Sequence, residues 1–235
     1  MRAAILAIGN ELVCGDVPNT NASWLAQRLE RLGVKVVISA SVPDELDLIV
    51  DFLQRERERV DHVIATGGLG GTPDDITRES VAAAFGVSRR VQPELASELR
   101  ERFRGDPDYA ARWAALPDGA QPLENPLGGA PGFRIGNVWV LPGLPREMEA
   151  MFDRYSEEFR AGDPIGVSRR TYETRESTIA GALADATERW PSVSVGSYPR
   201  FEPGGPQVEV VLKSSDPDAL TAAKTWLEAE LDRLT

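Results

Sequence analysis

The sequence predicts an α/β protein: a three-layer domain with a mostly parallel sheet, followed by a small α+β domain. Over the first two-thirds of the chain, segments rich in β-branched residues alternate with segments whose apolar residues have helical spacing. Glycine-containing turns lead directly from strand to helix, as they do in repeated βα units. A stretch with glycine and proline at residues 161–166 then separates the last part of the chain. We therefore expect one domain over residues 1–165 and a second over residues 166–235.

The first half of the first domain contains predicted pairs of strand and helix. Apolar and β-branched runs mark the strands, and apolar residues at i, i+3, i+4 and i+7 mark the helices. Gly33 is placed to end the first helix, and Asp44 is placed to cap the second. The predicted strands are residues 2–8, 34–42 and 62–66, and the predicted helices are residues 21–32, a segment that begins after Asp44 and a segment that ends at Phe85.

The remaining elements follow from the same patterns. The second domain is predicted as a strand, a helix, two strands and a helix, and Asp216 followed by Pro217 is typical of the start of that last helix. In the first domain we expect helices at residues 93–104, 108–115 and 146–159 and a strand at 138–141, and in the second domain strands at residues 169–174, 193–198 and 208–213.

The composition argues against several classes of protein. The net charge is −11 without a basic cluster, so we expect no binding of nucleic acid. No apolar run reaches the roughly 18 residues of a membrane span, and we expect a cytoplasmic protein with no membrane partner. One cysteine, Cys14, and one histidine, His62, exclude an internal disulfide and a Cys/His zinc cluster. His62 is expected to be a buried structural residue and Cys14 a small buried or loop residue. A catalytic metal would need oxygen ligands, which favours Mg²⁺ or Mn²⁺.

The strongest functional motif is a glycine-rich loop between a predicted strand and a predicted helix, residues 66–77. Four glycines in five positions let the main chain approach a ligand closely, and the following helix offers free N–H groups. These features predict a phosphate-binding loop; the alternative is a tight turn, which needs only one or two glycines. The expected phosphate-binding residues here are Thr66, Gly67, Gly68, Gly70, Gly71 and Thr72.

Two carboxylates, Asp74 and Asp75, lie beside this predicted anion site. Carboxylate and phosphate would repel each other unless a cation lay between them, so a divalent metal ion is predicted there. Asp44 follows the neighbouring predicted strand, and adjacent parallel strands would bring it to the same edge of the sheet as Asp75. The alternative role for each aspartate is that of a helix cap. We expect Asp44 and Asp75 to be catalytic, and Asp44, Asp74 and Asp75 to hold the metal.

Two further segments end predicted strands at the same edge. One begins with Gly9-Asn10-Glu11 and continues to the start of the first helix, and the other is residues 141–147. From the spacing alone, each segment could equally be a structural turn or a ligand-binding loop. Arg78 and Arg146 are the nearest cations to a bound phosphate, although most such arginines are solvated surface residues. The candidate nucleotide-binding residues in these segments are Asn10, Glu11, Asn19, Asn21, Gly143 and Pro145.

The chain resembles the CinA (competence/damage-inducible protein A) family in its short form, without the C-terminal deamidase domain. The resemblance rests on several motifs in the same order along the chain. Residues 1 to about 165 resemble the molybdopterin-binding, MogA/MoaB-like domain, and the remainder resembles the small KH-like domain that follows it. The matching motifs are GNEL at 9–12 with NTNASWLAQRL at 19–29, TGGLGGTPDDIT at 66–77, NPLGGAPG at 125–132, LPGLPREMEAMF at 141–152, RES at 175–177 and VGSYPR at 195–200.

The resemblance implies a metal-dependent nucleotide pyrophosphatase that hydrolyses ADP-ribose to AMP and ribose 5-phosphate. It implies a divalent ion (Mg²⁺, Mn²⁺ or Co²⁺), a homo-oligomer, and functional roles for the residues that match the family's aspartates, Asp44 and Asp75. The alternatives are a molybdopterin-binding protein or adenylyltransferase of molybdenum cofactor biosynthesis, and a nucleotide-binding protein without catalysis. Gly71 replaces a proline that is common in the family loop, and Asn10 replaces an aspartate. These departures bear on substrate choice and metal binding more than on the fold.

Overall fold

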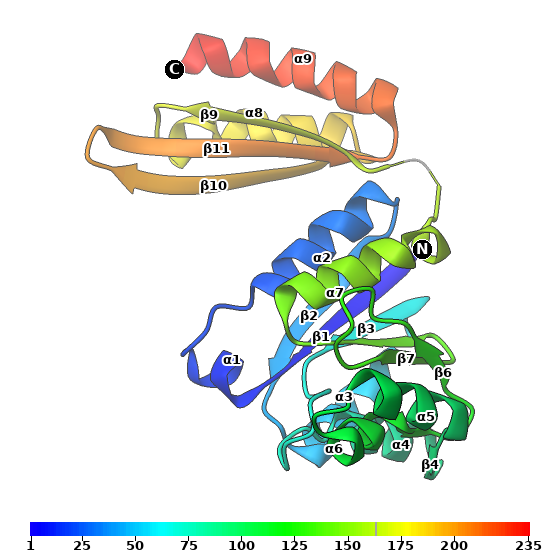
Figure 1. Ribbon diagram of the computed structural model, residues 1–235. Helices are drawn as coiled ribbons and strands as arrows, with labels where there is room; N and C mark the ends of the chain where they lie inside the picture. Colours follow the sequence, from blue (N-terminus) through cyan, green and yellow to red (C-terminus); the bar gives the residue numbers. More distant parts are fainter. Residues whose placement is uncertain (163) are drawn as a thin grey trace. The chain divides into compact units, whose positions relative to one another are not determined.

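The protein divides into two compact units in a computed structural model that describes residues 1–162 and 164–235 (Figure 1). The first unit comprises Met1–Glu30 and Val34–Ala161, and the second comprises Gly162–Thr235 together with the short segment Arg31–Gly33. Each unit has its own sheet and its own apolar core. The division of the chain lies within the stretch of glycine and proline.

The first unit is built on a sheet in the order β2-β1-β3-β8-β7-β6. Strands β2, β1, β3 and β8 are parallel to one another, and β7 and β6 are antiparallel additions at one edge. The predicted three-layer α/β fold with a mostly parallel sheet is therefore confirmed. The strands are β1 (Arg2–Ile8), β2 (Lys35–Val42), β3 (His62–Thr66), β6 (Gln121–Leu123), β7 (Gly132–Ile135) and β8 (Val138–Leu141).

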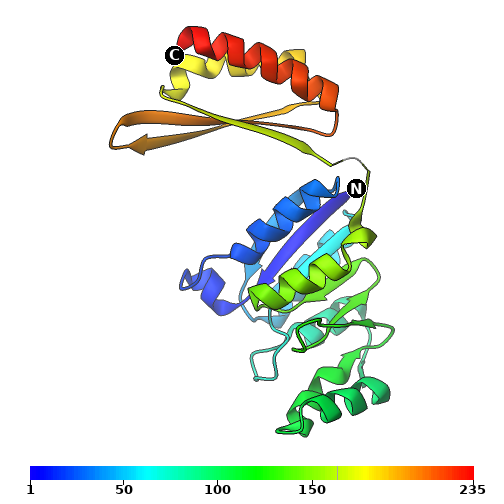
Figure 2. The ribbon, with the colours of Figure 1, turned by 45° about the horizontal axis from the view of Figure 1, so that its top comes forward.

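Helices cover both faces of this sheet (Figures 1 and 2). On one face, α3 (Leu46–Glu56) and α4 (Thr77–Phe85) pack on β1 and β3 through a continuous apolar core. On the other face lie α2 (Thr20–Arg31) and α7 (Pro145–Arg154). These two helices are in contact through the rings of Trp24 and Phe152, which pack edge to face. Because both faces are covered, β1 after its first residue and the whole of β3 are buried. Such runs of apolar residues are what the sequence shows in these strands.

The other elements of the first unit are short. A small helix, α1 (Asn10–Cys14), follows β1 directly, and Cys14 is exposed rather than buried. The predicted helix at 146–159 divides into α7 and a 3₁₀ turn, η2 (Ser156–Phe159). Between β4 and β5, which pair as a two-stranded ladder, the chain forms the remaining helical segments. These elements are β4 (Arg89–Val91), α5 (Pro93–Arg102), α6 (Pro107–Ala111), η1 (Arg112–Ala114) and β5 (Ala115–Pro117).

Two expectations about Asp44 are wrong in detail. The N-cap position of α3 is occupied by Glu45, whose side chain makes no capping hydrogen bond, and the carboxylate of Asp44 accepts a hydrogen bond from the N–H of Asn10. Strands β2 and β3 are not neighbours either, because β1 lies between them. The segment after β1 is therefore inserted between Asp44 and the glycine loop.

The second unit has the predicted order of elements. Its antiparallel sheet has the order β10-β11-β9, and α8 and α9 pack on one face through residues such as Ile179 and Leu227. As predicted, Asp216 caps the last helix, with Pro217 in its first turn. The elements are β9 (Gly166–Tyr172), α8 (Glu176–Arg189), β10 (Ser194–Glu202), β11 (Gly205–Ser214) and α9 (Pro217–Leu234).

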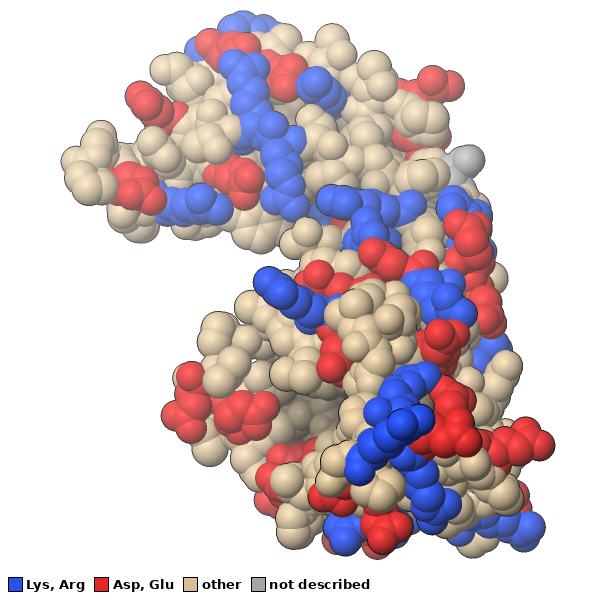
Figure 3. All heavy atoms as spheres, in the orientation of Figure 1, with Lys and Arg blue, Asp and Glu red and all other residues tan. Residues whose placement is uncertain are grey.

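Two features bear on the excluded functions. On the face seen in Figure 3, basic side chains form runs that have acidic side chains beside them. Within residues 1–162 and 164–235, no helix combines the length and the apolar character that crossing a membrane would require.

His62 is buried as expected: it lies in β3 with its ring 5.1 Å from that of Phe159, and burial lowers the pKa of its imidazole.

Candidate functional site

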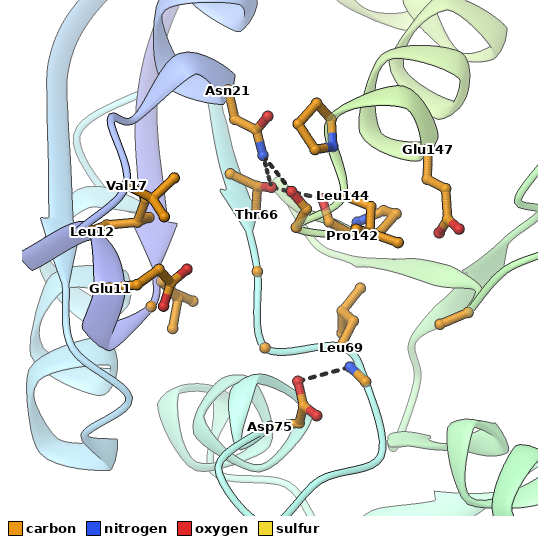
Figure 4. Close-up of a pocket in the computed structure, with 18 of the residues that line it drawn as sticks. Glu11, Leu12, Val17, Asn21, Thr66, Leu69, Asp75, Pro142, Leu144 and Glu147 are labelled. Carbon is orange, nitrogen blue, oxygen red and sulfur yellow. Dashed lines mark hydrogen bonds between the residues drawn. The ribbon is translucent and has the colours of Figure 1, made fainter. Parts of the chain in front are cut away.

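A pocket of about 520 Å³ lies at the carboxyl ends of the parallel strands of the first unit (Figure 4). This volume is within the range of small-molecule sites, and this edge is where open α/β sheets bind ligands. The segments after β1, β2, β3 and β8 all contribute to its wall. Glu11, Asp75 and Glu147 lie on different sides of it (Figure 4).

The pocket brings together most of the residues that the sequence singles out. Asn10, Gly71 and Thr72 are not among the residues that line it. Asn10 acts on the pocket indirectly, because its N–H is bonded to Asp44. The predicted residues that do line the pocket are Glu11, Asn19, Asn21, Asp44, Thr66, Gly67, Gly68, Gly70, Asp74, Asp75, Gly143 and Pro145.

The glycine loop approaches its surroundings too closely for larger residues. Gly67 has a φ of +105°, and a Cβ atom there would lie 2.1 Å from the carbonyl oxygen of Ile8. Gly68 has a φ of +60°, and its Cβ atom would lie 2.2 Å from the hydroxyl oxygen of Thr77. A simple chain reversal does not require such contacts. Glycine is needed at these two positions because the main chain of the loop lies directly against neighbouring atoms.

Asp75 organises the loop from within. One oxygen of its carboxylate accepts a hydrogen bond from the N–H of Gly70, and the other accepts bonds from the N–H and the hydroxyl of Thr72. The N–H of Gly67 is also engaged, by the carbonyl of Leu141. The amides that could bind a ligand are therefore fewer than the sequence suggests. In the described part of the chain, those of Gly68, Leu69 and Gly71 have no protein partner.

The charges that line the pocket are all negative. Asp44 is half-buried, and desolvation raises the pKa of its carboxyl, with the N–H of Asn10 opposing and the negative charges of Glu11, Asp74 and Asp75 adding to the rise. Glu147 lies at the far wall. Among the described residues that line the pocket there is no lysine, arginine or histidine. An anionic ligand could not bind here without a cation to offset these carboxylates.

The two predicted cations lie elsewhere. Arg146 is exposed and does not line the pocket. Arg78 is only 4% exposed and lies behind the glycine loop, where its guanidinium donates to the carbonyls of Leu69 and Gly70. Burial lowers the pKa of Arg78 to about 10, so the side chain still carries its charge near neutral pH.

The carboxylates fit a metal ion that is shared with a ligand. No group of three or more His, Cys, Asp or Glu residues gathers closely enough, within the described residues, to form a complete metal site. Mg²⁺, however, is usually held by one or two carboxylates together with phosphate oxygens and water. Asp44 has one oxygen that accepts no hydrogen bond within the described chain, and Asp75 has a lone pair to spare on the oxygen that faces Gly70. Each of these two carboxylates thus keeps an oxygen that could bind a cation, and Asp74 stands exposed at the rim.

A polar network fixes the wall between β3 and α7. The side-chain N–H₂ of Asn21 donates to the hydroxyl of Thr66 and to the carbonyl of Gly143, and Thr66 donates to the carbonyl of Pro142 (Figure 4). These acceptors fix the orientation of the amide. Its oxygen is buried and has no hydrogen-bond partner among the described residues.

Trp113, Gly129 and Ala130 also line the pocket and were missed from the sequence, and Leu144 and Glu147 were not singled out within the candidate segment 141–147. The side-chain N–H₂ of Asn125 donates to Glu147 and to the carbonyl of Ala130, which ties the segment before β7 to the start of α7. Two of the motifs already noted, at 125–132 and 141–152, contain these residues. No comparable signal marked Trp113.

Comparisons with known proteins support one family for the whole chain. A family described as a probable molybdopterin binding domain matches residues 4–161, and the middle domain of FAD synthase matches residues 169–234. A CinA-like protein of Frankia casuarinae is 45% identical over 208 residues, which are 80% of this chain and 48% of that protein. A protein of Pyrobaculum arsenaticum is 41% identical over 227 residues, which cover 91% of this chain and 86% of the relative.

A solved structure agrees with these relatives. The crystal structure of the protein CinA with unknown function from Thermoplasma acidophilum has a TM-score of 0.64 and 32% sequence identity, and covers 68% of this chain and 100% of that one. The chain thus spans about half the length of the Frankia protein but most of the length of the Pyrobaculum protein.

Proposed function

This chain belongs to the CinA-like proteins, with a first unit of the MogA/MoaB-like molybdopterin-binding family, and from this premise we propose that it is a metal-dependent nucleotide pyrophosphatase. The proposed substrate is ADP-ribose and the products are AMP and ribose 5-phosphate. One observation carries the proposal: unpartnered main-chain amides and several carboxylates line the same pocket, without a basic side chain among its described residues. A ligand that combines phosphate groups with a divalent cation satisfies both sets of groups at once.

The proposed reaction is the hydrolysis of a phosphoanhydride. The oxygen of a water molecule forms a bond to one phosphorus, the bond from that phosphorus to the bridging oxygen breaks, and a proton of the water is released. Asp44 and Asp75 would hold the divalent ion, which when bound neutralises phosphate charge. The amides of Gly68 and Leu69 would orient the phosphate oxygens, and positioning would supply much of the rate.

The direct test is a screen of substrates and metals. ADP-ribose, NAD, FAD and ATP are incubated with the full chain and Mg²⁺, Mn²⁺ or Co²⁺, and the products are separated by chromatography. FAD is included because the second unit matches a domain of FAD synthase. We expect AMP and ribose 5-phosphate from ADP-ribose only when a metal is present. Asp44→Asn should abolish the products, whereas Asp51→Asn, which removes an exposed carboxylate on α3, should not. No cleavage with any metal refutes the proposal.

A second candidate function is molybdopterin binding or adenylyl transfer. The description of the family that matches residues 4–161 favours it. In that case the pocket would bind a pterin, and ATP would yield an adenylylated product rather than hydrolysis of ADP-ribose. Incubation with molybdopterin and ATP in the same screen distinguishes the two functions.

A further inference from the structure

Several carbonyl groups of the glycine loop bond to the start of one helix. The hydroxyl of Thr77 donates to the carbonyl of Gly67 at 2.8 Å, and its N–H donates to that of Gly68 at 3.3 Å. The guanidinium of Arg78 donates to the carbonyls of Leu69 and Gly70 at 2.8 and 3.2 Å. Four successive carbonyls are thus held by two consecutive residues at the start of α4.

This arrangement determines where the amides point. In a planar trans peptide the N–H points opposite to the C=O of the same peptide group. The N–H groups of Gly68, Leu69, Gly70 and Gly71 are therefore turned away from α4. That of Gly70 meets the carboxylate of Asp75, and the other three have no partner within residues 1–162 and 164–235. Gly68, Leu69 and Gly70 line the pocket.

A role in stability alone accounts poorly for Arg78. Its side chain is 4% exposed, and its Nε atom has no hydrogen-bond partner in the described structure. A buried charge without a full set of partners generally costs stability, and an apolar side chain of similar size is often as good for the fold. The positive charge lies behind a loop whose other side faces a pocket lined by carboxylates.

We propose that Arg78 is a positioning residue for anion binding: it holds the loop carbonyls from behind and so presents the loop amides to a pyrophosphate group in the pocket. Arg78 does not line the pocket and acts through the main chain. The inference rests on the proposed function only in that the pocket binds a phosphate-containing ligand. It does not require that the ligand be hydrolysed.

The test uses inorganic pyrophosphate with Mg²⁺ as the probe and the isotopically labelled full chain. Titration followed by NMR should shift the amide resonances of Gly68 and Leu69, which line the pocket, while that of Gly181 in the second unit stays in place. Arg78→Met should weaken pyrophosphate binding about 10- to 100-fold, the effect expected for lost charge-assisted hydrogen bonds. Arg89→Met is the matched control, because it removes an exposed arginine that pairs with Glu79 on α4 without touching the loop.

Arg78→Lys keeps the charge but replaces the planar guanidinium by a single ammonium group. Its affinity for pyrophosphate should therefore lie between those of the wild type and Arg78→Met. Wild-type affinity in a folded Arg78→Met protein overturns the proposal. If Arg78→Met does not fold, the lysine variant decides, and wild-type affinity there overturns it as well. Shifts confined to other amides in the wild type also overturn it. ADP-ribose turnover is measured in parallel: wild-type protein that binds pyrophosphate on these amides without hydrolysing ADP-ribose argues against the hydrolase and supports the role of Arg78.

Discussion

The carboxylate of Asp75 gives the sharpest test of the proposed chemistry. In Asp75→Asn one of its two oxygens becomes an N–H₂ group, which then faces either the N–H of Gly70 or that of Thr72. Whichever way the amide turns, at least one hydrogen bond to a charged acceptor is lost and two donors face each other. Loss of such a bond costs about 1.5–3 kcal/mol, and the proposed metal ion would lose a charged ligand in addition. We therefore expect turnover to fall at least about 100-fold, which corresponds to roughly 2.7 kcal/mol of activation free energy.

The assay is steady-state hydrolysis of ADP-ribose at saturating metal, with circular dichroism to confirm that the variant is folded. Glu79→Gln is the matched control, because it removes an exposed carboxylate of α4 that does not line the pocket. Its turnover should match the wild type. Wild-type turnover in a folded Asp75→Asn protein would refute the assignment of Asp75 to the reaction, and complete unfolding of the variant would refute the view that this carboxylate acts locally.

Three other substitutions test the structure more widely. Gly67→Ala should destabilise the first unit by at least about 1–3 kcal/mol in chemical denaturation and abolish pyrophosphate binding, because the residue has a φ of +105° and the new methyl group meets the carbonyl of Ile8; a neutral effect contradicts the loop geometry. His62→Phe should flatten the acid side of the stability profile. Burial lowers the pKa of His62 below its ordinary 6.5, so the stabilisation from the neutral ring is complete above that pH and is lost as the pH falls toward the lowered pKa; equal slopes of unfolding free energy against pH in both proteins contradict this. Gly181→Ala, in the exposed interior of α8 with open space around the added methyl, should stabilise the second unit by about 0.5–1 kcal/mol in the same denaturation assay, and destabilisation contradicts the helical assignment.

The sequence was informative wherever burial is nearly complete. β1, β3 and β8 begin and end at the residues that the apolar runs predict. In a strand covered on both faces, nearly every side chain must be apolar, so the pattern alone marks the ends. The antiparallel strands β6 and β7 were not predicted, because each is only three or four residues long and carries polar or glycine residues.

The candidate site was predictable in its location but not in its hydrogen bonds. The glycine loop and Asp44 do meet in one pocket, since parallel strands end at one edge. The carboxylate of Asp75 accepts hydrogen bonds from two loop amides and so determines which amides remain free. The orientation of this side chain cannot be predicted from the neighbouring sequence. Arg78 resembles any charged residue in the first turn of a helix, and only the packing of α4 against the loop buries it. The residues around Asp44 predict a helix cap, but its carboxylate accepts a hydrogen bond from the N–H of Asn10, which is distant in the sequence.

The strand order has a consequence for biosynthesis. β1 is made before the other strands of its sheet, but β3 gains its second neighbour only when β8 has been made, roughly 70 residues later, a delay on the order of 4–14 seconds. Throughout that interval a nascent chain presents an apolar strand with one free edge, which could pair with another chain. The pocket itself is complete only after residue 147 has left the exit tunnel. A ligand could therefore bind only late in translation, and its binding would then stabilise the folded domain against unfolding.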